Sequence, residues 1–183
     1  TSYFCANTKK TVISLTALSK QLSEPSKPFD SWRPTECGEL PIMINEHGQW
    51  FYDGSEITRP AMVKLFASVL CKEGEQFYLK TPIEKIAIEV QDAPFVIVSW
   101  HIESTAQGQV MCCVDNLARQ WLISAEQPLY IKNYKNAAVP YLQLPYGCSA
   151  RVSRSVFYQW AEIADADERG YFIKSAGGKF YLS

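Results

Sequence analysis

The sequence has no excess of basic charge and no long apolar run. Its 183 residues include 18 Lys and Arg and 19 Asp and Glu, for a formal net charge of −1. A nucleic-acid-binding protein needs a basic excess or a basic stripe, so we expect no nucleic-acid partner. No apolar run approaches the ~20 residues of a membrane-spanning helix, so we expect no membrane partner. Hydrophobic content of 47% with 20% charged residues is typical of a globular chain.

Recognisable catalytic motifs are also lacking. The chain contains no P-loop, no GxGxxG turn, no GxSxG elbow and no HExxH helix. Its two histidines, His47 in a predicted turn and His101 in a predicted strand, have no nucleophile at a recognisable spacing. We therefore expect no catalytic residue and no cofactor, and the sequence favours a protein that is not an enzyme.

Cysteine usage argues against a metal site. The cysteines show no CxxC pair and no regular spacing, and neither histidine lies near a cysteine pair in the sequence. We therefore expect no metal. Reduced and mostly buried thiols are typical of a cytoplasmic protein, which is the location that we predict. The six cysteines are Cys5, Cys37, Cys71, Cys112, Cys113 and Cys148.

The first 36 residues are predicted to be an appendage to a larger body. Leucines recur on one face of a short helix over residues 14–22. Three prolines then indicate an extended loop over residues 24–34. Trp32 in that loop could pin it to the core or form an exposed aromatic clamp.

Residues 37–95 are predicted to form a first α+β unit. A tight hairpin turn is expected at residues 45–48. Thr58 followed by Pro60 is typical of a helix start, and apolar residues recur at the helical spacing over residues 59–72. The predicted strands of this unit cover residues 41–44, 49–52, 76–80 and 83–90.

Residues 96–183 are predicted to hold antiparallel strands and a second α+β unit. Between residues 83 and 131 the pattern is of strands only, which is typical of a meander or a rolled sheet. Ser153 is a typical cap for a helix over residues 154–165. The predicted strands cover residues 95–103, 109–114, 119–124, 129–131, 141–144, 171–174 and 179–182.

The two predicted helices and the strands after them align at an offset of 95 residues (58 to 153). Any capped helix followed by a strand would give part of this match, so a chance likeness is the alternative to a duplication. The interpretation that we adopt is an α+β fold of two β-roll-like units. Each unit packs antiparallel strands on one helix, and a weak internal repeat relates the two. Ligand sites often lie where such units meet, so we expect the site between them.

Arginines occur at the start of both predicted helices, at Arg59 and Arg154. A cation in the first turn opposes the helix dipole, so each arginine needs a partner. That partner is either an internal carboxylate or an anionic ligand, which helix N-termini favour. Tyr158 lies one helical turn after Arg154 and completes the first set of candidate ligand-binding residues.

The stretch from Thr81 to Lys85 is the most polar part of the first unit. Pro82 favours an extended conformation at Thr81. Glu84 and Lys85 are neighbours on a predicted strand, so their side chains face opposite ways. We take Glu84 and Lys85 as the second choice of ligand-binding residues. The alternative is a strand start that carries surface charges.

Three motifs have a specific spacing, at residues 48–52 (GQWFY), 81–85 (TPIEK) and 92–95 (DAPF), and they are accompanied by residues 37–44 (CGELPIMI), 57–60 (ITRP) and 77–80 (FYLK). In these motifs the chain resembles DUF1285, a bacterial family of unknown function, from about Trp32 to its C-terminus. The chain departs from the usual family pattern at Glu39 and Pro41. The resemblance implies a two-part α+β roll with repeated motifs. It implies no established activity and no known catalytic residues, and a regulatory or signalling role is an expectation only.

These observations support three hypotheses about function. The first is a non-enzymatic regulatory protein of the bacterial cytoplasm that binds a small anionic ligand or a protein partner between its repeat units. The second is an enzyme without a recognisable motif that uses Glu84 or Asp92 as a base. The third is a structural interaction module with an exposed apolar patch around Trp32 or Trp121.

Overall fold

The computed structural model describes residues 14–16, 18, 31–106 and 108–183. The chain forms two compact units, unit 1 over Thr1–Asp92 and unit 2 over Ala93–Ser183. The predicted helix over residues 14–22 is described only at residues 14–16 and 18, and most of the predicted loop after it also lies outside the described residues. No helix in the described part of the chain is both long and apolar enough to cross a membrane.

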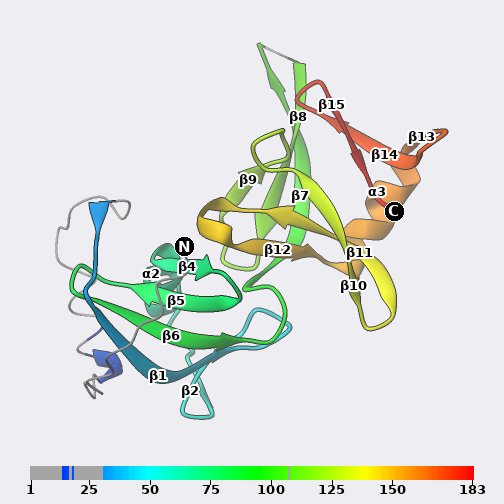
Figure 1. Ribbon diagram of the computed structural model, residues 1–183. Helices are drawn as coiled ribbons and strands as arrows, with labels where there is room; N and C mark the ends of the chain where they lie inside the picture. The colour runs from blue at the N-terminus through cyan, green and yellow to red at the C-terminus, as the bar shows by residue number, and fades with distance from the viewer. Residues whose placement is uncertain (1–13, 17, 19–30, 107) are drawn as a thin grey trace. The chain divides into compact units, whose positions relative to one another are not determined.

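Unit 1 is built on a six-stranded sheet and a helix. Its elements are β1 (Glu36–Ile44), β2 (Trp50–Tyr52), β3 (Ser55–Glu56), α2 (Pro60–Ser68), β4 (Leu70–Glu73), β5 (Gln76–Lys80) and β6 (Glu84–Val90). The strands β1-β2-β3 and β4-β5-β6 form two antiparallel meanders (Figure 1). One parallel pair, β1 with β6, joins the meanders, so the strand order is β3-β2-β1-β6-β5-β4.

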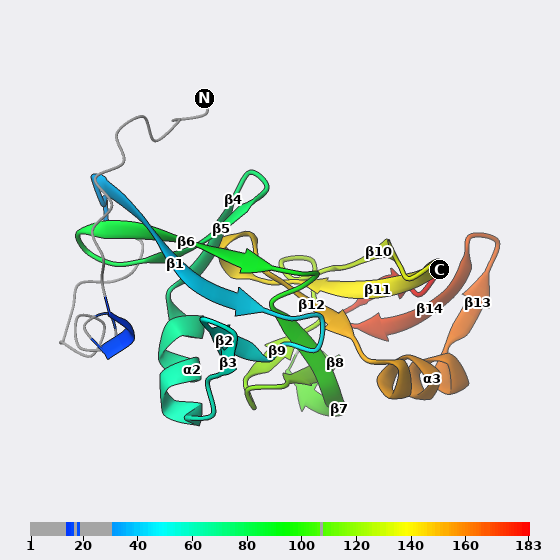
Figure 2. The same cartoon turned by 90° about the horizontal axis from the view of Figure 1, so that it is seen from below.

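Helix α2 covers one face of this sheet, as Figure 2 shows. Trp50 lies opposite Ile44 in the register of β1 and β2, so both side chains point to the same face. The ring centre of Trp50 is 6.2 Å from that of Phe66 on α2. Every second residue over 40–44 in β1 and 84–88 in β6 is buried on this face, as expected for a sheet with one covered side. These buried residues are Leu40, Ile42, Ile44, Glu84, Ile86 and Ile88.

Helix α2 is shorter than the predicted helix over residues 59–72. Proline disfavours the helical conformation in the residue before it, and Arg59 before Pro60 is extended, with φ −81° and ψ 107°. The predicted cap at Thr58 is therefore wrong: the N-cap is Arg59, whose side chain makes no capping hydrogen bond. At the other end, residues 70–73 pair with β5 as strand β4, and this tertiary pairing overrides helical propensity.

Unit 2 contains a second six-stranded sheet, a helix and a smaller sheet. Its elements are β7 (Phe95–Thr105), β8 (Gly108–Asp115), β9 (Gln120–Leu122), β10 (Leu129–Tyr134), β11 (Ala137–Gln143), the short 3-10 helix η2 (Pro145–Gly147), β12 (Ser149–Val152), α3 (Arg154–Ile163), β13 (Asp165–Asp167), β14 (Gly170–Ser175) and β15 (Gly178–Tyr181). The six-stranded sheet has the order β10-β11-β12-β7-β8-β9, and β13-β14-β15 form a separate sheet.

Helix α3 begins where the sequence predicts. The Ser153 hydroxyl accepts a hydrogen bond from the Val156 N–H, which confirms the predicted cap. Trp160 of α3 is fully buried, and its ring centre lies 6.5 Å from that of Trp100 on β7. The Trp100 indole N–H also donates to the Gln159 side-chain oxygen at 2.7 Å. These contacts hold α3 against the long strand β7.

The two six-stranded sheets share one topology. Meander β7-β8-β9 joins meander β10-β11-β12 through the parallel pair β7 with β12, as β1 joins β6 in unit 1. The α+β class and the two-unit repeat are therefore confirmed. The offset of 95 residues between the two helices does not relate the two six-stranded sheets, because α2 comes between the two meanders of its sheet and α3 follows both meanders of its own. A helix followed by a three-stranded meander does occur twice, but the second meander, β13-β14-β15, forms its own sheet.

Four cysteines are buried free thiols: Cys71, Cys112, Cys113 and Cys148. Burial raises the pKa of Cys71 to about 11 and that of Cys113 to about 12, so these thiols stay protonated at neutral pH. Cys37 is part of a disulfide, so the prediction of six reduced thiols is wrong at that residue.

Candidate functional site

The parallel junction of unit 1 contains a bulge at Pro41. Glu39 pairs with Ala87, and Met43 pairs with Glu89, so β1 takes four steps where β6 takes two. Proline has no N–H to offer a neighbouring strand, which confines it to bulges and edges of sheets. Because β1 carries two extra residues, the alternation of faces is kept. Glu39, Pro41 and Met43 therefore point away from the face that α2 covers.

Backbone groups beside the bulge find partners outside the β1–β6 ladder. The Asp53 N–H donates to the Pro41 carbonyl at 2.8 Å. The Gln76 side-chain amide donates to the Ile88 carbonyl at 2.8 Å and to the Phe77 carbonyl at 3.0 Å. The turn after β2 and the start of β5 are thereby held next to the widened junction.

A groove of about 430 Å³ opens at this junction, and we call it the β1–β6 groove. Glu39, Asp53 and Glu89 in its lining are exposed acidic residues. None of its eleven lining residues is a Lys or an Arg. Several carboxylates without a nearby cation favour a positively charged ligand. The lining residues are Glu39, Leu40, Pro41, Ile42, Met43, Asp53, Gly54, Gln76, Ala87, Ile88 and Glu89.

Glu84 lies on the core side of β6 and is only 2% exposed. The Thr81 hydroxyl accepts from the Glu84 N–H and donates to the Glu84 carbonyl, each at 3.0 Å. The carboxylate oxygen Oε1 of Glu84 is buried without a hydrogen-bond partner in the described part of the chain. Burial, and to a lesser degree the charge of Glu36 opposite it on β1, raises the pKa of the Glu84 carboxyl.

Lys85 faces away from Glu84, as the strand pattern predicts. Its ammonium lies 2.5 Å from a carboxylate oxygen of Glu73 and 4.4 Å from the ring centre of Tyr78. The two predicted residues therefore do not form one site, because they lie on opposite faces of β6. Neither residue lines the β1–β6 groove.

Arg154 and Tyr158 are brought together on α3. The Arg154 Nε donates to the Tyr158 hydroxyl at 2.8 Å, and both side chains are exposed. Arg59 is exposed at the start of α2 in unit 1. A ligand-binding role for these three residues stays a prediction.

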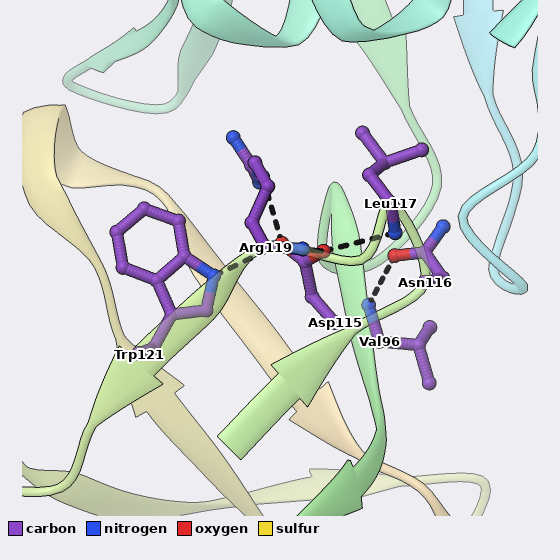
Figure 3. A network of polar contacts seen from close by, with 6 residues as sticks. All are labelled: Val96, Asp115, Asn116, Leu117, Arg119 and Trp121. Atoms are coloured by element: carbon purple, nitrogen blue, oxygen red, sulfur yellow. Dashed lines mark hydrogen bonds and ion pairs between the residues drawn. The ribbon is translucent and has the colours of Figure 1, made fainter. Parts of the chain in front are cut away.

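A buried carboxylate at Asp115 closes the turn between β8 and β9 (Figure 3). Its Oδ1 accepts from the backbone N–H groups of Leu117 at 2.9 Å and Arg119 at 3.0 Å. Its Oδ2 accepts from the Arg119 Nε at 2.8 Å and the Trp121 indole N–H at 2.9 Å. Because four donors occupy this carboxylate, it serves the fold and offers little to a ligand.

The tryptophans expected in an exposed apolar patch are not exposed. Trp32 is only 6% exposed, so the exposed-clamp alternative is wrong for that residue. Trp121 is half-buried, and its indole N–H is used by Asp115. Neither residue supports the hypothesis of an interaction module.

Three metal-ligating side chains meet in unit 2: His101, Glu103 and Cys112. The expectation of no metal site rests on spacing along the chain, which cannot detect residues that face each other across a hairpin. One donor atom from each side chain lies within 4.8 Å of the other two.

Comparisons with known proteins point to one family. Family models match residues 27–93 to the N-terminal domain, and residues 94–182 to the C-terminal domain, of DUF1285, described as of unknown function. The solved structure of a DUF1285 family protein from Silicibacter pomeroyi DSS-3 is 30% identical, with a TM-score of 0.84 over 94% of this chain and 96% of that one. A DUF1285 family protein from Shewanella baltica OS155 is 24% identical, with a TM-score of 0.55 over 67% of this chain and 91% of that one, and shows the fold alone. No curated protein matches.

Proposed function

The chain belongs to the DUF1285 family, and from that premise we propose that it is a non-enzymatic regulatory protein whose β1–β6 groove binds a cationic group. The cation is an ammonium or a guanidinium, either on a small molecule or on a basic side chain of a partner. The observation that carries the proposal is the set of three exposed acidic residues around the Pro41 bulge.

Size and composition of the groove support binding. Its volume of about 430 Å³ falls in the range of roughly 300–1,000 Å³ that is typical of small-molecule sites. Its lining includes the apolar residues Pro41, Met43 and Ala87, which face away from α2, and Gln76 is held at its edge by two hydrogen bonds. The lining includes no Ser, Thr, Cys, His or Lys, so its only side chains of a nucleophilic type are the carboxylates themselves. These features favour a binding role over covalent catalysis.

The proposal is tested by titration calorimetry of the full chain with two probes, spermidine and the peptide acetyl-Gly-Lys-Gly-amide. At least one probe is expected to bind, and the double variant Glu39→Gln/Glu89→Gln is expected to weaken that binding about tenfold, which corresponds to about 1.4 kcal/mol. Binding should also weaken as salt is added, because exposed charges are screened. Preference for one probe separates a free amine from a basic side chain.

Glu75→Gln is the matched control for charge. Glu75 is an exposed carboxylate of the same unit, in an ion pair with Lys72, and it does not line the groove. This variant should bind the probes as the unchanged protein does. If neither probe binds, or if the double variant and the control bind equally well, the cationic-ligand proposal is wrong.

An anionic ligand at the helix starts is a separate proposal. Its supporting observation is the exposed Arg154 guanidinium, which is held against the Tyr158 hydroxyl at the first turn of α3. If this site binds anions, inorganic phosphate should raise the melting temperature. Arg154→Ala should then lower phosphate affinity about tenfold, because hydrogen bonds to charged groups contribute about 1.5–3 kcal/mol. Arg59→Ala tests the equivalent position of α2. Unchanged phosphate affinity in both variants would end this proposal.

An enzyme that uses Glu84 as a base is the remaining alternative. Its supporting observation is the raised pKa of this buried carboxyl, which is common among catalytic acids and bases. The position of Glu84 outside the β1–β6 groove argues against it.

A further inference from the structure

The hairpin of β7 and β8 presents three different metal-ligating side chains on one face. His101 and Glu103 are two residues apart on β7, so both point to the same side of the sheet. Cys112 lies directly opposite His101 in the antiparallel register. The His101 Nε2 is 3.0 Å from the Glu103 Oε1, and one donor atom of each of the three side chains lies within 4.8 Å of the others.

These distances suit a tetrahedral ion after a small adjustment. Zinc bonds of about 2.3 Å to sulfur and about 2.0–2.2 Å to nitrogen and oxygen place tetrahedral ligands roughly 3.3–3.7 Å from one another. The His101–Glu103 pair is already close to this separation. The remaining separations are at most 4.8 Å, so they need a change of at most about 1.5 Å, which side-chain rotation in the two exposed residues can supply.

The donor set selects a class of ion. Magnesium and calcium prefer oxygen ligands alone, whereas a thiolate with an imidazole favours zinc and similar transition metals. From these three residues we infer a site for one zinc-like divalent ion at His101, Glu103 and Cys112. Three protein ligands leave the fourth position to water or to a bound molecule.

The surroundings of Cys112 fit this role. The Cys112 residue is only 1% exposed, while the imidazole of His101 and the carboxylate of Glu103 are exposed, so an ion reaches the thiol from the solvent side. A coordinated metal ion itself removes the proton from the thiol.

Cobalt titration tests this inference on the full chain, with any oligohistidine tag removed and metals stripped by a chelator. Co²⁺ should bind once per chain and produce an absorption band from thiolate-to-cobalt charge transfer, and Zn²⁺ should abolish the band by competition. Cys112→Ser should remove the band. His101→Ala and Glu103→Gln should each weaken Co²⁺ binding at least about tenfold, since the loss of even an outer-sphere partner of a metal ligand costs about that much.

Matched controls separate this site from other thiols and histidines. Cys148→Ala removes another buried thiol of the same unit, and His47→Ala removes the other histidine. Both controls should keep the charge-transfer band. No band in the unchanged protein, or a band that survives Cys112→Ser, overturns the inference. If Cys112→Ser fails to fold, the His101→Ala and Glu103→Gln variants test the metal site instead, because both residues are exposed. Unchanged cobalt affinity in these two variants would also overturn the inference.

Discussion

Asp115→Ala is expected to lower the free energy of unfolding of unit 2 by about 3–5 kcal/mol, the usual cost of breaking a buried ion pair on one side. The change leaves the Arg119 guanidinium and the Trp121 indole N–H without their acceptor. It also leaves the backbone N–H groups of Leu117 and Arg119 without theirs. Burial prevents water from replacing all four bonds, since Asp115 is only 1% exposed.

Urea unfolding of fluorotryptophan-labelled protein measures this effect unit by unit. Trp100, Trp121 and Trp160 report on unit 2, and Trp32 and Trp50 report on unit 1. Asp115→Asn is the control, because it keeps one acceptor oxygen and should cost less than alanine. A loss below about 1 kcal/mol for Asp115→Ala would match an exposed ion pair and contradict the buried network.

Glu84→Met is expected to raise the free energy of unfolding at pH 7 by about 1–3 kcal/mol, the usual cost of a buried unsatisfied polar atom. The Glu84 Oε1 has no hydrogen-bond partner in the described part of the chain, and its carboxylate is held in a core position of β6. Methionine has a similar length and no charge, so it fills the space without the desolvation cost.

The raised pKa of Glu84 also makes the free energy of unfolding depend on pH. Folding raises the pKa of this carboxyl above its ordinary value of 4.5, so between the two pKa values the folded state binds more protons than the unfolded state. The free energy of unfolding therefore falls as pH rises through the folded pKa, and the contribution of Glu84 is fully present only below the unfolded pKa. Glu84→Gln removes this dependence.

Chemical denaturation of the native protein and of the Glu84→Gln and Glu84→Met variants, between acid and neutral pH, measures these differences. The free energy of unfolding that Glu84→Gln gains over the native protein should disappear toward low pH, where the native carboxyl is already protonated. Lys85→Gln is the matched control on the opposite face of β6. If both Glu84 variants are less stable than the native protein at pH 7, the carboxylate has a stabilising partner and the prediction is wrong.

A buried carboxylate that lowers stability suggests a functional role for Glu84, because residues that destabilise the fold concentrate at functional sites. Activity that depends on Glu84 would revive the enzyme alternative.

Local patterns predicted much of the fold. The alternation of Ile86 and Ile88 with Lys85 placed β6 correctly, and Ser153 marked the start of α3. The same alternation places Glu84 on the face of Ile86 and Ile88, so its burial could have been predicted from the sequence. The end of α2 could not be read locally, because residues 70–73 become a strand only through pairing with β5.

The candidate sites depend on which residues of neighbouring strands pair, and local sequence patterns do not predict this pairing. The predicted strand began at Pro41, whereas β1 begins at Glu36 and carries Pro41 in its interior as a bulge, and the groove needs the parallel pairing of β1 with β6, whose residues are far apart in the chain. His101 and Cys112 are opposed only in one register of the β7–β8 hairpin, and a shift of one residue would separate them.

Amide chemical-shift mapping with the two probes, spermidine and acetyl-Gly-Lys-Gly-amide, tests the proposed function most directly. In the labelled full chain, we expect shifts to concentrate at Glu39, Leu40, Ile42 and Met43 and at residues 87–89, with smaller changes at Asp53 and Gln76. The Glu39→Gln/Glu89→Gln variant should lose them. Shifts that instead concentrate around Arg154 and Tyr158, or the absence of saturable shifts with both probes, would contradict a cation-binding groove in unit 1.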